Sequence, residues 1–249
     1  MKDLYSLRTI GELFGVSTDK GFADGYLKVS GTKIVGEALG LRLECRLDEH
    51  ETLTVRKDII TNLSKNPITI RSAFSRFSFV GGEYDVYTQY SGWESESMGA
   101  WQPLVTAVET SVETIRTSHD AAPFTALLSR QTNRGVAFHL LPHGLWKMRV
   151  KRYARGSEAS YVTLECGPNE RNFSYTLAPG EALELPTLLF YTVSDKVGLD
   201  AWKLHRYCNE VYPKPVMPVF YNSWMYRFDR FTPELLMEQV DTAADLGFE

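Results

Sequence analysis

The sequence predicts a mainly β chain, in which a large antiparallel β-sandwich is followed by a short helical linker and by the first strand and helix of a parallel α/β domain. Three features indicate this architecture. Apolar and polar residues alternate with a period of two from Tyr26 to Ser194, the pattern becomes helical after Ser194, and residues Pro218–Glu249 form one buried strand, a loop and one amphipathic helix. A single strand and helix cannot bury their apolar faces alone, so we expect the rest of that domain to be absent from this chain.

The clearest predicted strand is Leu39–Asp48, in which leucines and Cys45 alternate with charged residues. Similar runs occur at Thr52–Arg56, Ile68–Val80, Tyr84–Tyr90, Leu104–Arg116, Phe124–Leu128, Val136–Leu141, Leu145–Tyr153, Tyr161–Glu165, Phe173–Leu177 and Leu185–Val193. One twisted open sheet rarely holds so many strands, so we expect two packed layers.

A helix is predicted after the sandwich. Asp200 is placed as its N-cap, and an apolar stripe runs along the helix to about Val211. The members of this stripe are Leu199, Trp202, His205 and Cys208. Two prolines in the segment 212–215 then favour an extended linker. The predicted divisions are residues 1–197 for the sandwich, 198–217 for the helix and linker, and 218–249 for the terminal strand and helix.

The terminal helix has clear start and stop signals. Thr232 is a suitable N-cap, Pro233 fits the first helical position, and Glu234 complements the helix dipole. Gly247 fits the position after the C-cap. The sequence therefore indicates the first strand and helix of either a barrel or a doubly wound sheet.

Asn222 and Trp224 lie just after the predicted terminal strand. In a (β/α)8 barrel the carboxyl ends of the strands form the active site, so both side chains would face it. A tryptophan ring there offers its face to a sugar, and an asparagine supplies directed hydrogen bonds. The alternative is that Trp224 only fills the junction between domains.

Composition excludes several classes of function. The apolar content of 43% and the charged content of 23% are those of an ordinary globular protein, and a net charge of −4 gives no basic surface for nucleic acid. No stretch is apolar enough for a membrane helix or a signal peptide, so we expect a cytoplasmic protein. The three cysteines lack paired spacing and are expected to be reduced. We expect no metal site and no cofactor.

The densest aromatic cluster outside the terminal unit contains Trp93 and Trp101, with Tyr87, Gln89 and Tyr90 nearby. It is interpreted as a sugar-binding surface, a subunit contact or a cover for the sandwich edge.

The histidines and carboxylates of the sandwich give weaker signals. His139 and His143 are four residues apart, but Pro142 between them excludes a helical metal-binding pair. His119 is expected to bond the backbone of its own loop. Asp85, Glu109 and Glu113 are expected on solvated strand faces.

Residues Tyr221–Glu249 resemble the opening of the catalytic barrel in glycoside hydrolase family 36, the α-galactosidases or melibiases. That opening has Asn-Ser/Thr-Trp, then Phe-Asp, then a helix ending in Ala-Ala-x-Leu-Gly. Earlier segments are similar to the N-terminal β-supersandwich of the same family, namely Thr88–Glu96, Ser118–Phe124 and Leu177–Asp195. The resemblance covers nearly the whole chain and is weakest before Leu39.

This resemblance implies an antiparallel β-supersandwich, a helical linker and an incomplete (β/α)8 barrel. Its members are retaining glycosidases that remove terminal α-galactosyl groups, with an aspartate nucleophile and an aspartate acid/base on later barrel strands. Trp224 and Asn222 would then bind substrate, both catalytic carboxylates would lie downstream of Glu249, and this chain alone would be inactive. A homo-oligomer is also implied.

The sequence departs from the family pattern at two places. Met225-Tyr226 stands where many members have Glu-Ala, and Trp93–Glu96 replaces an Arg-rich loop that closes a neighbouring subunit's site in some tetramers. The α-galactoside preference is therefore the leading hypothesis. A stand-alone carbohydrate-binding or interaction module is the alternative.

Overall fold

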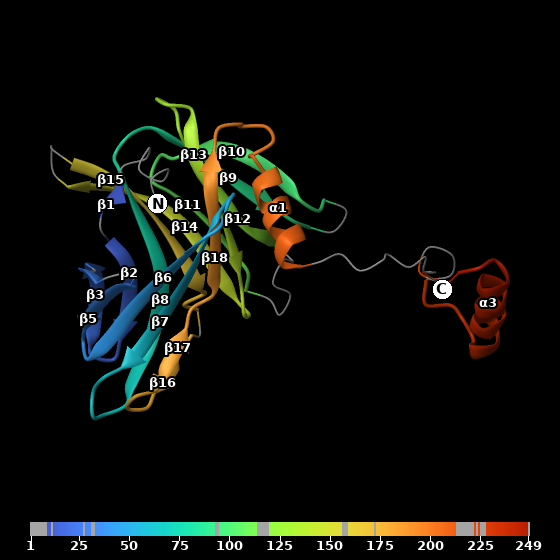
Figure 1. Ribbon diagram of the computed structural model, residues 1–249, viewed down its shortest axis with the longest axis horizontal. Coiled ribbons are helices and arrows are strands. Elements are labelled where there is room, and N and C mark those ends of the chain that lie inside the picture. The colour runs from blue at the N-terminus through green and yellow to red at the C-terminus, as the bar shows by residue number, and fades with distance from the viewer. Residues whose placement is uncertain are drawn as a thin grey trace. The chain divides into compact units, whose positions relative to one another are not determined.

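A computed structural model describes residues 9–10, 12–26, 28–30, 33–92, 95–113, 120–155, 159–171, 173–212, 222, 224 and 228–248. It divides the chain into two compact units, Met1–Tyr207 and Cys208–Glu249. The first unit consists of two antiparallel sheets packed as a sandwich (Figure 1). The mainly β sandwich predicted from the sequence is confirmed. The predicted divisions at residues 197 and 217 stay a prediction.

The two sheets contain all the strands among the described residues. The eight-stranded sheet has the order β11 (Ala107–Ser111), β14 (Trp146–Arg155), β15 (Ala159–Pro168), β8 (Ile68–Val80), β2 (Glu12–Thr18) and β3 (Gly21–Tyr26), with β1 (Thr9–Ile10) and β16 (Tyr175–Leu177) also paired to β8. The ten-stranded sheet has the order β10 (Met98–Pro103), β9 (Tyr84–Tyr90), β12 (Ala121–Ser129), β13 (Arg134–Leu141), β18 (Thr187–Val193), β7 (Thr54–Asn62), β6 (Leu41–Glu49), β5 (Lys33–Ala38) and β4 (Lys28–Ser30), with β17 (Ala182–Glu184) paired to β7.

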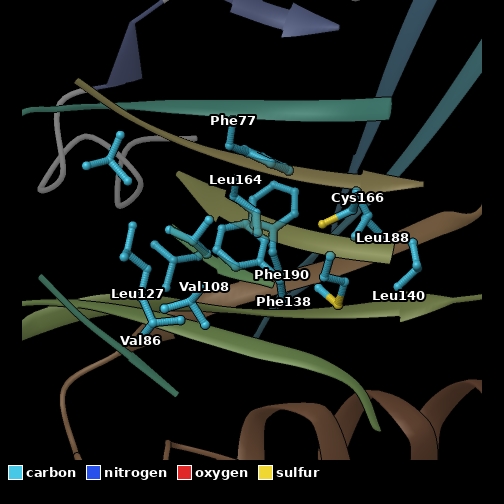
Figure 2. Close-up of a cluster of buried hydrophobic side chains, with 14 of the residues drawn as sticks. Phe77, Val86, Val108, Leu127, Phe138, Leu140, Leu164, Cys166, Leu188 and Phe190 are labelled. Atoms are coloured by element: carbon cyan, nitrogen blue, oxygen red, sulfur yellow. The ribbon is translucent and has the colours of Figure 1, made fainter. Parts of the chain in front are cut away.

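Two hydrophobic clusters fill the space between the sheets. The first has an aromatic centre in which the Phe77 ring lies 5.0 Å from that of Phe138 and 5.2 Å from that of Phe190. Figure 2 shows these rings together with Leu164 and Cys166 from β15. The second cluster contains residues of β2, β6, β7 and β8, with Phe14 and Ile60 fully buried. Each cluster receives side chains from both sheets, which is how alternating strands bury one face.

The strength of the alternation decided which strands could be predicted. In β6, Leu41, Leu43 and Cys45 are buried and the residues between them are partly or fully exposed, as expected. Strand β10 was missed because none of its residues is buried, so it has no period-two pattern. It is held by pairing with β9 instead. Among the described residues of the predicted run 104–116, the strand is shorter than expected: β11 covers Ala107–Ser111 and belongs to the other sheet from β10.

Helix α1 (Trp202–Val211) follows the last strand, and its first half covers the outer face of the ten-stranded sheet (Figure 1). Leu204 and Tyr207 pack against a third cluster there, together with Leu199. The expected stripe is therefore partly wrong, since Trp202 is 55% exposed and His205 is also exposed.

The predicted cap of this helix is also wrong. The Asp200 carboxylate accepts hydrogen bonds from the backbone N–H of Ser194 at 2.6 Å and from its hydroxyl at 3.1 Å. Leu199 and Asp200 have left-handed φ angles of 54° and 48°, and the helix begins after them at Trp202.

The second unit contains helix α3 (Pro233–Asp245), which begins and ends as predicted. Thr232 is its N-cap, and the Thr232 hydroxyl accepts a hydrogen bond of 3.3 Å from the N–H of Leu235. At the other end Gly247 has a φ of 79°, and its N–H donates to the Ala244 carbonyl while the Phe248 N–H donates to that of Ala243. This is the Schellman arrangement that a C-terminal glycine permits. No described helix is long and apolar enough to cross a membrane.

A buried ion pair lies between the two core clusters. Arg56 and Asp58 are side chains of β7 with exposed fractions of 1% and 0%, and the Arg56 Nε lies 2.8 Å from the Asp58 Oδ2. Arg56 also donates to the Arg76 carbonyl on β8 at 2.7 Å, and Ser75 on the same strand donates to Asp58. The pair therefore bonds one sheet to the other.

Removing one partner of this pair should be costly. We expect Asp58→Asn to lower the free energy of unfolding by about 3 to 5 kcal/mol, because it removes the carboxylate that is paired with the buried Arg56 charge. Asp48→Asn is the matched control, since Arg46 and Asp48 form the same two-residue-spaced pair on β6 but Arg46 is 70% exposed. The control should cost less than about 1 kcal/mol. Urea unfolding of the three proteins measures this, and equal costs would contradict the argument.

Candidate functional site

Asn222 and Trp224 form a short turn in the second unit. The Asn222 Oδ1 accepts a hydrogen bond of 2.9 Å from the backbone N–H of Trp224. The Trp224 ring meets the Phe228 ring edge-on, with 5.4 Å between centroids. The turn thus fixes the position of Trp224 through its own side chains and backbone.

The Trp224 side chain is available for a ligand. It is 54% exposed, and the planes of the Trp224 and Phe228 rings meet at 77°. An indole with an open face can stack on the apolar side of a sugar ring, while its N–H remains a hydrogen-bond donor. The amide nitrogen of Asn222 is left to donate, because the amide oxygen is used within the turn. Their role in substrate binding stays a prediction.

Helix α3 presents an open groove in the same unit. The groove has a volume of about 400 Å³ and is lined mainly by apolar atoms, including Leu235, Ala243 and Leu246. No residue of this helix is buried. Leu246 is 70% exposed and Val240 is 58% exposed. The second unit by itself therefore leaves the apolar face of α3 open.

The cluster around Trp101 has a structural role in the sandwich. The Trp101 Nε1 donates a hydrogen bond of 2.9 Å to the Lys196 carbonyl, and the Lys196 ammonium lies 5.2 Å from the Trp101 ring centroid. Tyr87 meets the same ring edge-on at 5.4 Å. These contacts hold the 194–200 loop against the sheet, and a sugar-binding or subunit-contact role for Trp101 stays a prediction. Trp93, His119 and most of the loop between β11 and β12 lie outside the described residues.

Asp85 is buried, contrary to the prediction from the sequence. It is 7% exposed, whereas a solvated strand face was expected. Arg130 donates to the carboxylate at 2.6 Å and Lys196 at 2.8 Å. Burial alone would raise the pKa of Asp85, but these two cations hold the pKa below its ordinary value. Both partners are distant in sequence, so strand periodicity could not reveal them. Glu109 and Glu113 are exposed as expected.

A row of stacked rings lies on the outer face of the ten-stranded sheet. The His139 ring stacks on Phe124 at 4.3 Å and on Tyr191 at 5.7 Å, and its Nε2 lies 3.3 Å from the Tyr191 hydroxyl. Burial, with a further contribution from the charge of His205, lowers the pKa of His139 to about 4. His139 is therefore a neutral packing residue at physiological pH. Among the described residues no group of three or more His, Cys, Asp or Glu is arranged to hold a metal ion.

A separate hollow at one end of the sandwich was not found from the sequence. Its volume is about 340 Å³, and it is lined by three segments around His143, Asn169 and Glu184. These segments are brought together only by the packing of the two sheets. The one local signal was the turn at residues 142–144, which gives no indication of a cavity.

Comparison with known proteins connects the whole fold to one group of enzymes. The chain is 26% identical over 212 residues to the bifunctional α-galactosidase/sucrose kinase AgaSK of Mediterraneibacter gnavus. This aligned region covers 82% of this chain and 22% of the relative. It is 23% identical over 233 residues to the α-galactosidase AgaA of Geobacillus stearothermophilus, covering 87% of this chain and 31% of the relative. No protein-family model matches the chain.

Solved structures give the same result for the fold. The galactosidase domain of AgaSK superposes with a TM-score of 0.79 at 20% identity, covering 95% of this chain and 38% of that structure. The family 36 α-galactosidase AgaA, solved in complex with stachyose, superposes with a TM-score of 0.78 at 18% identity and the same coverage. The resemblance predicted from the sequence is confirmed. The chain spans between about a fifth and two fifths of the length of these relatives.

The partly buried His139 predicts a pH-dependent stability. The folded pKa lies below the unfolded value, so the unfolded chain binds the extra proton, and stability falls as the pH drops from about 6.5 toward 4. We expect His139 to account for about 2 kcal/mol of lost stability between pH 7 and pH 5. In His139→Phe this part of the loss should disappear.

The measurement is urea unfolding at several pH values. His143→Gln is the matched control, because His143 is exposed, and it should keep the parental pH dependence. An unchanged pH dependence in His139→Phe would show that burial of this ring is not responsible.

Proposed function

We propose that this chain is the N-terminal portion of a retaining α-galactosidase-like glycoside hydrolase that acts on terminal α-galactosides. The observation that carries the proposal is the likeness to family 36 α-galactosidases over 95% of the chain. The sandwich would act as the scaffold on which a catalytic barrel is built. Asn222 and Trp224 would form one edge of the sugar pocket.

The proposed chemistry assigns binding to these residues and bond cleavage to others. The open Trp224 ring packs on the apolar face of the galactosyl group, and the Asn222 amide donates to a hydroxyl. Retaining hydrolysis needs two carboxyl groups about 5 Å apart, one to attack the anomeric carbon and one to protonate the leaving oxygen. We assign neither role within these 249 residues. The chain alone is therefore proposed to be inactive.

The exposed helix α3 supports the barrel assignment. An isolated helix of its length is marginal in water, and in proteins most helical stability comes from packing of the apolar face. Helix α3 has complete caps at both ends but no buried residue. This combination fits an element whose apolar face is covered by further strands and helices of a barrel.

The first test concerns the coding sequence and the activity together. We expect the reading frame to continue past Glu249 into a second strand ending in Asp-Gly-Trp or Ala-Gly-Trp. The polypeptide that includes the whole barrel should hydrolyse p-nitrophenyl α-galactoside. Trp224→Ala should lower kcat/KM about tenfold or more, because the stacking surface is lost.

Trp202→Ala is the matched control for that variant, since Trp202 is 55% exposed and Trp224 is 54% exposed. The control should keep full activity. A stop codon directly after Glu249, or hydrolysis by the 249-residue chain itself, would contradict the proposal.

A second test uses the 249-residue chain. Deleting residues 218–249 removes the exposed apolar face of α3, so the truncated protein should aggregate less than the parent at equal concentration. Light scattering over a concentration series measures this. Greater aggregation of the truncated protein would mean that the terminal unit is not an unfinished domain.

A further inference from the structure

The hollow at the end of the sandwich combines parts of both sheets. It is bordered by the turn between β13 and β14, by the segment that follows β15, and by the connection from β17 to β18. Strands β14 and β15 belong to the eight-stranded sheet, whereas β17 and β18 belong to the ten-stranded sheet. With a volume of about 340 Å³ it lies within the range of small-molecule sites.

The floor of the hollow is apolar and anchored in the sandwich. Phe173 and Leu183 line it and pack against the second core cluster, and Leu145 contributes a side chain that is 38% exposed. Pro168 and Pro186 restrict the backbone on two sides. The floor is thus a fixed apolar surface next to water.

The loop after β15 is held rigidly by Asn169, which is 3% exposed. The Asn169 backbone N–H donates to the Leu145 carbonyl at 3.0 Å, and its side-chain oxygen accepts from the N–H of Arg171 at 3.0 Å. Its amide nitrogen lies 3.4 Å from the Val112 carbonyl. A site built on such a loop loses little conformational entropy when it binds a ligand.

The rim supplies polar groups of several kinds. His143 and Glu184 are exposed and line the hollow, and neither side chain makes a hydrogen bond or ion pair within the part of the chain that the structure describes. Arg171 is paired with Glu113, which neutralises its charge while some of its guanidinium N–H groups remain available. A carboxylate that accepts, a guanidinium that donates and an imidazole that does either therefore surround the apolar floor.

We propose that this hollow is a second saccharide-binding site, separate from the turn of Asn222 and Trp224. A sugar has an apolar ring face for the floor and hydroxyl groups that both donate and accept for the rim. The unpaired Glu184 disfavours an anionic ligand by charge repulsion. The choice of a saccharide rests on the proposed function, whereas the hollow itself rests on the sandwich alone. The site would hold a sugar on the scaffold.

The test is titration of the 249-residue chain with methyl α-galactoside and with raffinose, followed by calorimetry or by NMR. Saturable binding in the millimolar range is expected. Glu184→Ala should weaken it about tenfold, because a hydrogen bond to a charged acceptor is lost. His143→Ala should also weaken it. Both side chains are exposed, so the variants should fold like the parent.

Glu83→Ala is the matched control, since Glu83 is exposed and does not line the hollow. Trp224→Ala should leave this binding unchanged. If Trp224→Ala removes the binding and Glu184→Ala does not, the sugar binds the terminal unit and the inference is wrong. If neither sugar binds, the inference is also wrong, while the hydrolase proposal still stands or falls on the activity of the longer polypeptide.

Discussion

The sandwich depends on the placement of one buried charge, the guanidinium of Arg56. Its centre lies 4.7 Å from the ring of Phe77 in the first core cluster and 5.4 Å from the ring of Phe14 in the second. Asp58 on the same strand supplies the counter-charge, and the backbone of the facing sheet accepts a further hydrogen bond. Burying this pair costs desolvation energy that an apolar core would avoid. The pair fixes the register of β7 in return, because a shift of this strand by one residue would move Arg56 out of the core and away from its partners.

The outer faces of the two sheets are completed in different ways. The ten-stranded sheet is covered by apolar contacts to Leu199, Leu204 and Tyr207, so β13 and β18 carry apolar residues on both faces. The eight-stranded sheet instead carries a ladder of ion pairs across its strands. In this ladder Glu165 on β15, which is 2% exposed, binds Arg76 on β8 and Arg149 on β14. Two cations share one carboxylate there, so the ladder connects three neighbouring strands through a single residue.

Local patterns predicted the elements that local physics controls. The alternation of β6 and the caps of α3 were predictable because one is set by a single buried face and the other by hydrogen bonds within a few residues. Strand β10, the face of α1 and the burial of Asp85 were not, since each depends on partners far away in sequence. The same reason hides the hollow between the sheets, whose lining comes from three separate segments. Trp224 could be proposed from the sequence because its signal lies in contiguous residues, and its role stays a prediction.

The C-terminal unit shows why well-formed local structure does not by itself make a functional site. Capping and the Schellman turn set where α3 begins and ends, and each such contact contributes about 1 kcal/mol or less. Neither fixes where the helix packs. Met237, Val240 and Leu246 remain more than half exposed, so the unit gains little stability from burial of the apolar face of α3. Among the described residues, Trp224 and Asn222 are held by their own turn and by the ring of Phe228. Under the proposed function, burial of α3 by a barrel would make the geometry of these two residues toward a sugar precise, and assembly of the domain would be coupled to formation of the pocket.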